Sequence, residues 1–251
     1  LYHISKKEHN IICDYFPSEK INDKKYDLVI AQNVFAHTDN VNDFLKKIVE
    51  ILSDDGILYI QTSQSNMILN NEFDTIYHEH LSFFNSMSMK ILIEKNGLKL
   101  NNVFKFDIES IINNEKNNGL YDIKTYEKFA KNAQKIVLNL KNEIKKFKDN
   151  DYLIIGYGAA AKGMTVLNFG DIQMDYIIDD NPLKCNLYTP GTNILITDIN
   201  ILKNIDKKIL FIPLAWNFYN EIVNKIQIIR KNSNDIFLNY FPDISINNNK
   251  I

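Results

Sequence analysis

Residues 152–163 read Tyr-Leu-Ile-Ile-Gly-Tyr-Gly-Ala-Ala-Ala-Lys-Gly, and this stretch decides the fold class. The first four residues have the apolar character of a buried strand. The pair Gly156 and Gly158 then permits a tight turn, and small residues lead into a helix expected to run through Leu167. A strand, a glycine turn and a helix form the opening unit of Rossmann-like α/β folds. We therefore predict a Rossmann-like α/β domain over residues 151–251.

The glycine turn has two interpretations. Its backbone amides can approach a phosphate at the helix N-terminus, and Lys162 adds a positive charge beside them. The spacing departs from the dinucleotide fingerprint, and the nearest acidic residues about 20 positions on are Asp179 and Asp180. Close packing of strand against helix explains the small residues equally well. Both interpretations stay open at this point.

The rest of this half alternates between strands and polar turns. Further strands are expected at residues 176–178, 208–212 and 236–240, and a helix at 216–229. Asn181 lies in the turn after the first of these strands. Trp216, the single tryptophan, and Asn217 follow the second strand, where ligands bind in open α/β sheets. An anchoring aromatic of the core is the alternative role for Trp216.

A second α/β pattern precedes this one. We expect strands at residues 11–13, 26–31 and 57–61 and helices at 40–52, 86–96 and 122–148. Near-continuous apolar strands predict a parallel sheet covered on both faces. Residues 113–119 are polar and rich in turn formers, which favours a linker there. The predicted domains are residues 1–112, a linker and connecting helix over 113–150, and residues 151–251.

Composition narrows the class of protein. The chain has 251 residues, with 45% hydrophobic and 24% charged residues and a formal net charge of −2. We therefore expect no nucleic-acid partner, and no apolar run has the length of a membrane span. Cys13 and Cys185 form no CxxC pair, which argues against a structural zinc site and suits a reducing cytoplasm. Because the chain begins at Leu1 rather than Met, we expect a fragment.

Tyr77-His78-Glu79-His80 holds two of the five histidines with a glutamate between them. Histidine titrates near neutral pH, which suits it to proton transfer, and Glu79 could orient an imidazole. An extended segment would place His78 and His80 on one face. A surface turn with solvated histidines is the first alternative. A metal site with His37 as third ligand is the second.

Polar residues also follow the predicted strands of the first half. Asn33 and His37 come after the strand at 26–31, and Asp14 comes after the strand at 11–13. The carboxyl ends of parallel strands are the usual ligand-binding edge of such sheets. This placement favours a functional role for the three residues, with plain loop positions as the alternative.

Three stretches together resemble the sugar C-methyltransferases that act on nucleotide-linked 4-keto deoxysugars. They are Gln-Asn-Val-Phe-Ala-His at residues 32–37, Phe-Asp-Thr-Ile-Tyr-His-Glu-His-Leu-Ser-Phe-Phe at 73–84, and Gly-Tyr-Gly-Ala-Ala-Ala-Lys-Gly-Met-Thr at 156–165. The last continues into the turns at 179–182 and 188–192 and into Leu-Ala-Trp-Asn at 214–217. The segments match in type and order across nearly the whole chain.

The resemblance implies a Rossmann-like domain that binds S-adenosyl-L-methionine (SAM), followed by an α/β domain that closes over the sugar nucleotide. It also implies an N-terminal zinc module and a glycine-rich SAM loop, neither of which this sequence contains. The fold class expected is thus a partial Rossmann-like methyltransferase domain followed by a second Rossmann-like α/β domain. The implied cofactor is SAM, and zinc would belong only to the absent module.

The resemblance also implies roles for the candidate residues. His80 would be the base that removes a proton beside the ketone, with Glu79 supporting it, while Tyr77 and His37 orient the keto sugar. Asp14 and Asn33 would contact SAM. The expected substrate contacts are His78, Gly156, Gly158, Lys162, Asn181, Trp216 and Asn217. The alternatives are a non-catalytic remnant that binds a nucleotide-sugar or a protein partner and, third, a metal hydrolase using the histidines.

Overall fold

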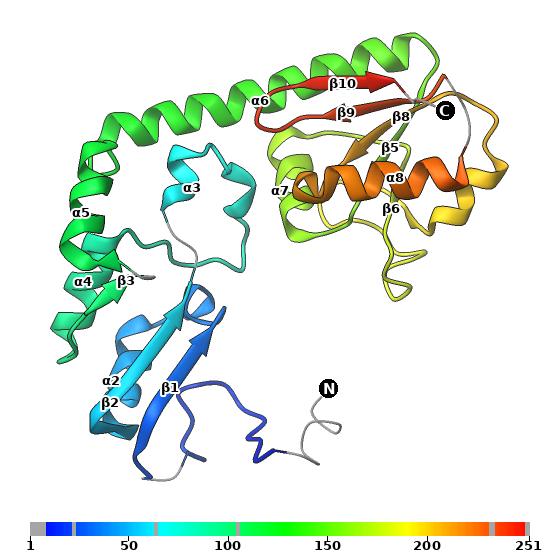
Figure 1. Cartoon of the computed structure of the whole chain (residues 1–251). Helices are drawn as coiled ribbons and strands as arrows, with labels where there is room; N and C mark the ends of the chain where they lie inside the picture. Colours follow the sequence, from blue (N-terminus) through cyan, green and yellow to red (C-terminus); the bar gives the residue numbers. More distant parts are fainter. Residues whose placement is uncertain (1–8, 22–23, 63–64, 104–105, 231–233, 249–251) are drawn as a thin grey trace. The chain divides into compact units, whose positions relative to one another are not determined.

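The computed structural model describes residues 9–21, 24–62, 65–103, 106–230 and 234–248. The chain divides into two compact units (Figure 1). The first unit comprises Leu1–Asn66 and His78–Tyr121, and the second comprises Met67–Tyr77 and Asp122–Ile251. The chain therefore passes between units more than once. The short segment Met67–Tyr77, which the sequence places within residues 1–112, groups with the second unit.

The first unit is built on a parallel pair of strands. β1 (Tyr26–Gln32) and β2 (Leu52–Gln61) are joined by η1 (Phe35–His37) and α2 (Val41–Ile51). The α2 helix begins where the side chain of Asn40 accepts hydrogen bonds from two backbone N–H groups of its first turn. Its buried face packs against the strands around Phe35, which is fully buried. The predicted strands at 26–31 and 57–61 and the helix at 40–52 are confirmed.

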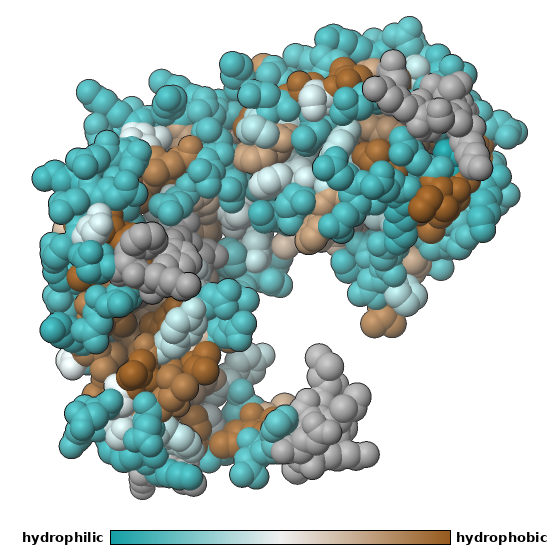
Figure 2. Space-filling model, in the orientation of Figure 1, coloured by the Kyte–Doolittle hydropathy of each residue, from teal (hydrophilic) through white to brown (hydrophobic). Residues whose placement is uncertain are grey.

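Two expectations for this sheet are wrong. Residues 11–13 form no strand, since their backbone is irregular. Within the described part of the first unit, the sheet is also covered on one face only: Leu28, Ile30, Ile57 and Tyr59 are each 56–64% exposed. Alternate residues of a strand face opposite sides, and α2 covers a single side. Figure 2 shows hydrophobic surface over this part of the first unit.

The regular elements described in the remainder of the first unit are two helices and an antiparallel pair of two-residue strands. α4 (Ser86–Lys95) is followed by β3 (Asn102–Val103), β4 (Phe106–Asp107) and α5 (Ile108–Asn117). The helix predicted at 86–96 is confirmed, and Gly97 ends it with a φ of +80°. Residues 113–117 of the predicted linker are helical, because α5 runs to Asn117. Its buried Glu115 accepts hydrogen bonds from the backbone N–H and hydroxyl of Ser86, at 3.0 and 2.7 Å.

The second unit contains a doubly wound sheet. Its elements in chain order are α6 (Ile123–Asp149), β5 (Leu153–Tyr157), α7 (Ala161–Gly170), β6 (Tyr176–Ile178), β7 (Ile196–Thr197), η3 (Ile199–Asn204), β8 (Ile209–Pro213), η4 (Trp216–Phe218), α8 (Tyr219–Ile229), β9 (Ile236–Asn239) and β10 (Ser245–Asn248). The strand order is β10-β9-β8-β5-β6-β7, and only the β9–β10 pair is antiparallel. The parallel strands follow the classic Rossmann order, whose switch point lies between β5 and β8. The predicted α/β fold is confirmed.

Helices cover both faces of this sheet (Figure 1). Ile155, Phe211 and Phe237 pack with α8 and η3 in one buried cluster. Residues one position along the strands, such as Ile154, face the opposite side, where α6 contacts β5 and α7. The strands β7 and β10 escape sequence analysis because they are short and carry little periodicity. Among the described residues, no helix combines the length and apolar character needed to cross a membrane.

Arg230, the only arginine in the sequence, forms a buried ion pair at the edge of this core. Arg230 is paired with Asp235, 2.6 Å from Nε to Oδ2, and both side chains are almost completely buried. The guanidinium also donates to the backbone carbonyls of Ile205 and Lys207. Burial raises the pKa of the Asp235 carboxyl, and the charge of Arg230 opposes that shift. The pair holds the loop after η3 against the start of β9.

Candidate functional site

The loop after β1 and the turn after Tyr77 are joined by hydrogen bonds within the first unit. The backbone N–H of Leu81 donates to the carbonyl oxygen of Ala36 at 2.8 Å. The imidazole Nδ1 of His37 lies 2.7 Å from the carbonyl oxygen of Glu79. The rings of His37 and His80 stand next to each other, with centroids 5.0 Å apart. The structure therefore brings two of the predicted site histidines together, although 42 positions separate His37 from Glu79 in the chain.

This contact fixes the tautomer of His37. A carbonyl oxygen only accepts hydrogen bonds, so Nδ1 of His37 must carry the proton. In the neutral imidazole, Nε2 then presents a lone pair and can accept a proton. A protonated His37 keeps the same bond and offers an N–H donor at Nε2 instead. The same nitrogen can thus serve as a base or, once charged, as a donor to an oxygen.

The other residues of the histidine motif differ in exposure. His80 is half-buried, and its ring makes an edge contact with Phe83 at 5.6 Å. His78 is 86% exposed, and its Nε2 lies 3.9 Å from the carboxylate of Glu79. Residues 78 and 79 form a turn rather than an extended strand. The alternating arrangement of an extended segment, with His78 and His80 on one face, therefore does not apply here.

Tyr77 precedes this turn but belongs to the second unit, where it is half-buried. The boundary between the units falls between Tyr77 and His78. The four residues of the motif are thus contributed by two different units. In the sequence the four residues read as one element, because nothing in the residue pattern marks a boundary between Tyr77 and His78.

The carboxyl ends of β1 and β2 are the candidate edge for SAM. Asn33 follows β1 directly with a φ of +52°, and its backbone N–H donates to Gln61 at 3.0 Å. Its exposed amide side chain fits a cofactor that offers both donors and acceptors. Asp14 lies in an irregular loop, where its carboxylate binds Lys20 at 3.0 Å and Ser18 at 2.8 Å. These bonds to Lys20 and Ser18 lower the pKa of Asp14 and keep it an acceptor.

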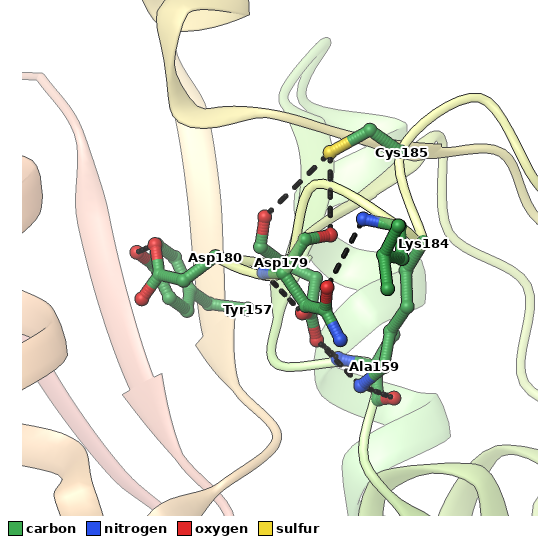
Figure 3. A network of polar contacts seen from close by, with 8 residues as sticks. Tyr157, Ala159, Asp179, Asp180, Lys184 and Cys185 are labelled. Atoms are coloured by element: carbon green, nitrogen blue, oxygen red, sulfur yellow. Dashed lines mark hydrogen bonds and ion pairs between the residues drawn. The ribbon is translucent and has the colours of Figure 1, made fainter. Parts of the chain in front are cut away.

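The glycine turn of the second unit is closed by its own acidic residue. Gly158 has a φ of +100°, and Asp179 at the end of β6 accepts a hydrogen bond from the N–H of Ala159 at 2.7 Å (Figure 3). Lys184 donates to the carbonyl oxygen of Ala159 at 2.8 Å and pairs with Asp179 at 3.3 Å. The carboxylate of Asp179 thus already accepts a hydrogen bond from one of the backbone amides that a phosphate would need. Gly156 supports the packing interpretation, since an added Cβ would meet Met174 at 2.9 Å.

A second polar group lies beside this turn. The hydroxyl of Tyr157 donates to Asp180 at 2.8 Å (Figure 3). Lys225 of α8 pairs with the same carboxylate. Burial and the hydrogen bond to Asp180 raise the pKa of Tyr157 to about 12. Asn181 is exposed, and its side chain accepts from the N–H of Leu183 at 3.0 Å, which makes it a turn residue.

The loop after β8 holds Trp216 in a specific place. Its indole Nε1 donates to Oδ2 of Asp74 at 2.7 Å, and Asp74 is 1% exposed. Lys162 of α7 stands over the indole ring, 5.0 Å from Nζ to the centroid. Asn217 is exposed. Trp216, Asn217 and Lys162 are recognisable as candidates in the sequence. Asp74 is not, because one carboxylate in the run Glu-Phe-Asp-Thr has the pattern of a surface residue.

The metal alternative requires three ligands in one place. Within the described ranges, no group of three or more His, Cys, Asp or Glu side chains is arranged to hold a metal ion. His37 and His80 stand side by side, but the contact shown by the His78 ring is with Glu79. The histidines therefore form a pair rather than a triad.

Comparison with known proteins relates the chain to two families of methyltransferase domains. The family described as "C-methyltransferase C-terminal domain" matches residues 88–242, more than half of the chain, and the family described as "Methyltransferase domain" matches residues 3–103. C-methyltransferase NovU of Streptomyces niveus is 24% identical over 223 residues, covering 78% of this chain and 53% of that protein. The chain spans about half the length of this curated relative. The chain belongs to the family of C-methyltransferases defined by this C-terminal domain.

Proposed function

We propose that the protein takes part in SAM-dependent C-methylation of a nucleotide-linked keto-deoxysugar. The observation that carries the proposal is the pairing of His37 with His80, fixed by the 2.7 Å bond from His37 to the backbone of Glu79. A paired imidazole site suits removal of a proton from the carbon next to a ketone. Membership of the C-methyltransferase family and similarity to NovU support the type of reaction.

The proposed roles follow from the chemistry of the reaction. A nitrogen of His80 removes the proton from the carbon beside the carbonyl, and the negative charge moves onto the keto oxygen. A charged His37 can donate from Nε2 to that oxygen, and the predicted role of Tyr77 is to orient the same carbonyl. Such donors stabilise charge as it develops. When bound, SAM supplies an electrophilic methyl group, and Asn33 and Asp14 are the residues proposed to contact it.

The fixed tautomer of His37 gives this histidine a second possible role. In its neutral form the lone pair on Nε2 makes it a competing base. Glu79 supports the pair in the structure through its backbone carbonyl, while its carboxylate lies near His78. The support that we propose for Glu79 is therefore positional.

Proton removal is measured separately from methyl transfer. The purified protein is incubated in D₂O with a nucleotide-linked 4-keto deoxysugar and without SAM, and deuterium uptake at the adjacent carbon is followed by NMR. His80→Gln should lower the uptake rate by roughly 10²–10⁴-fold, the usual contribution of a general base. His9→Gln, an exposed histidine outside the pair, is the control. Unchanged uptake in the His80 variant removes His80 from the base role.

Methyl transfer and SAM binding complete the test. Calorimetry measures SAM binding, and mass spectrometry detects one added methyl group on the sugar. His80→Gln should leave SAM binding nearly unchanged while transfer falls. A wild-type protein that binds the sugar nucleotide but neither binds SAM nor transfers methyl would instead support the non-catalytic alternative.

A further inference from the structure

The segment Met67–Tyr77 is the part of the chain that leads directly into the histidine motif. Within the second unit it packs through buried side chains, since Met67, Ile68 and Phe73 are each at most 7% exposed. The ring of Phe73 contacts Phe169 of α7 at 5.7 Å between centroids. The segment is therefore a folded part of the second unit and not a free connection.

Asp74 adds a polar contact to these apolar ones. Asp74, in η2 (Phe73–Thr75), is buried and accepts from the indole Nε1 of Trp216 at 2.7 Å. The two residues are 142 positions apart in the chain. Burial raises the pKa of Asp74, against the opposing effects of the Trp216 hydrogen bond and the Lys162 charge. Among the described residues, its Oδ1 has no hydrogen-bond partner.

Trp216, the hydrogen-bond donor to Asp74, is held in place by its neighbours. Trp216 begins η4 in the loop that follows β8, at the switch point of the Rossmann-like sheet. Its ring lies 4.3 Å from that of Phe241 between centroids, and Lys162 covers it at 5.0 Å. An indole packed in this way presents its N–H in a single direction. A donor with a fixed direction specifies the position of its acceptor more narrowly than apolar contact does.

The burial of Asp74 is energetically unfavourable by itself. A buried carboxyl with one oxygen unpaired costs free energy that an apolar residue at position 74 would not. Met67, Ile68 and Phe73 already supply apolar contact for the segment. What Asp74 adds is a directional bond to one place on the second unit.

We infer that the Asp74–Trp216 hydrogen bond anchors the segment Met67–Tyr77 on the second unit and thereby fixes the backbone position of Tyr77, three residues further on. Asp74 and Trp216 are then positioning residues. The indole N–H of Trp216 is engaged by the protein itself, which replaces the expected contact of that group with substrate. The anchor stands independently of the proposed function, and only its effect on methyl transfer rests on that function.

The single tryptophan makes the anchor directly observable. Its indole gives one Nε1–H resonance, whose exchange with D₂O reports on the bond to Asp74. Backbone exchange over residues 67–77 is followed by mass spectrometry on the same samples. The variants are Asp74→Leu, which removes the acceptor, Asp74→Asn, which keeps it without the charge, and Trp216→Phe, which removes the donor. Asp151→Asn, at an exposed ion pair before β5, is the matched control.

Asp74→Leu should speed exchange of the indole N–H and of the amides around Tyr77 by about tenfold, the effect of one lost hydrogen bond. Asp74→Asn should restore most of the protection, and Asp151→Asn should keep all of it. If either the indole N–H of Trp216 or the amides around Tyr77 exchange as slowly in Asp74→Leu as in the wild type, the anchor is overturned. If Asp74→Leu does not fold, Trp216→Phe decides by the same amide exchange around Tyr77.

Turnover separates the anchor from the proposed function. With the anchor lost, kcat should fall at least about tenfold while the dissociation constant for SAM stays unchanged, and Asp74→Asn should recover most of kcat. Loosened amides with an unchanged kcat would overturn the positioning role and leave the proposed function standing. A wild-type protein without methyl transfer would overturn the proposed function, and the exchange data would still decide the anchor.

Discussion

His37 and Glu79 are joined through a side chain on one loop and a backbone carbonyl on another, 2.7 Å from Nδ1 to oxygen. The bond leaves Nε2 as the reactive nitrogen of His37 and holds its ring beside that of His80. It also links the end of β1 to the turn after Tyr77. The position of the histidine pair therefore depends on backbone geometry rather than on a buried carboxylate.

Replacing His37 by asparagine separates the structural role of its Nδ1 from the chemical role of its Nε2. The asparagine Nδ2 takes approximately the place of the imidazole Nδ1, so it can keep the bond to Glu79, but the variant has no counterpart of Nε2. With His80 as the base, His37→Asn should lower methyl transfer by roughly 10²–10³-fold, the usual cost of one lost donor to a developing oxyanion, and by less than His80→Gln does. Deuterium uptake by the two variants is compared under identical conditions. A greater loss in His37→Asn would give the base role to His37.

Tyr77→Phe tests the predicted contact with the keto oxygen. Removing one donor to a developing oxyanion typically lowers kcat by roughly 10²–10³-fold. We expect a loss in this range, with the ring of the variant keeping the apolar contacts of Tyr77. Steady-state kinetics at saturating SAM measures it, and Tyr188→Phe, at an exposed tyrosine of the second unit, is the matched control. A variant with raised KM and normal kcat would show that Tyr77 contributes only to binding.

The Arg230–Asp235 pair should be essential for the stability of the second unit. Arg230→Met leaves Asp235 buried without its charged partner, and breaking such a pair typically costs about 3–5 kcal/mol. Urea unfolding followed by circular dichroism measures the change. Lys207→Met breaks the exposed pair with Asp151, which solvent screens, and should change the free energy of unfolding far less. If the two substitutions lowered the free energy of unfolding equally, burial would not make the Arg230 pair more important for stability than the exposed pair.

Asp74 should make stability depend on pH with a defined sign. Burial raises the pKa of Asp74 above its value in the unfolded chain, so the folded state keeps a proton that the unfolded state releases. Its contribution to stability is complete below that value and is lost as pH rises through the raised folded pKa. Asp74→Asn has no such titration, so its stability relative to wild type should increase with pH across this window. Denaturant unfolding at a series of pH values tests this, and a pH-independent difference would contradict it.

Local sequence decided much of the secondary structure. The alternation of apolar runs with glycine turns predicts the strands and helices of both α/β units, because periodicity and capping are set by neighbouring residues. The α6 helix shows this well: Asp122 caps its start, and an apolar stripe through Phe129 and Ile144 continues along it. The same logic fails for α5, since Glu115 in a polar run is stabilised by a distant partner, Ser86.

The sequence by itself determined the α/β class, the family resemblance and which histidines and glycines are candidates for function. Only the tertiary structure decided that His37 lies beside His80, that Asp179 closes the glycine turn and that Asp74 meets Trp216. These contacts join residues 20 to 142 positions apart. Hydrogen bonds depend on distances and directions in space, and those are set by how strands and helices pack, which no local residue pattern contains.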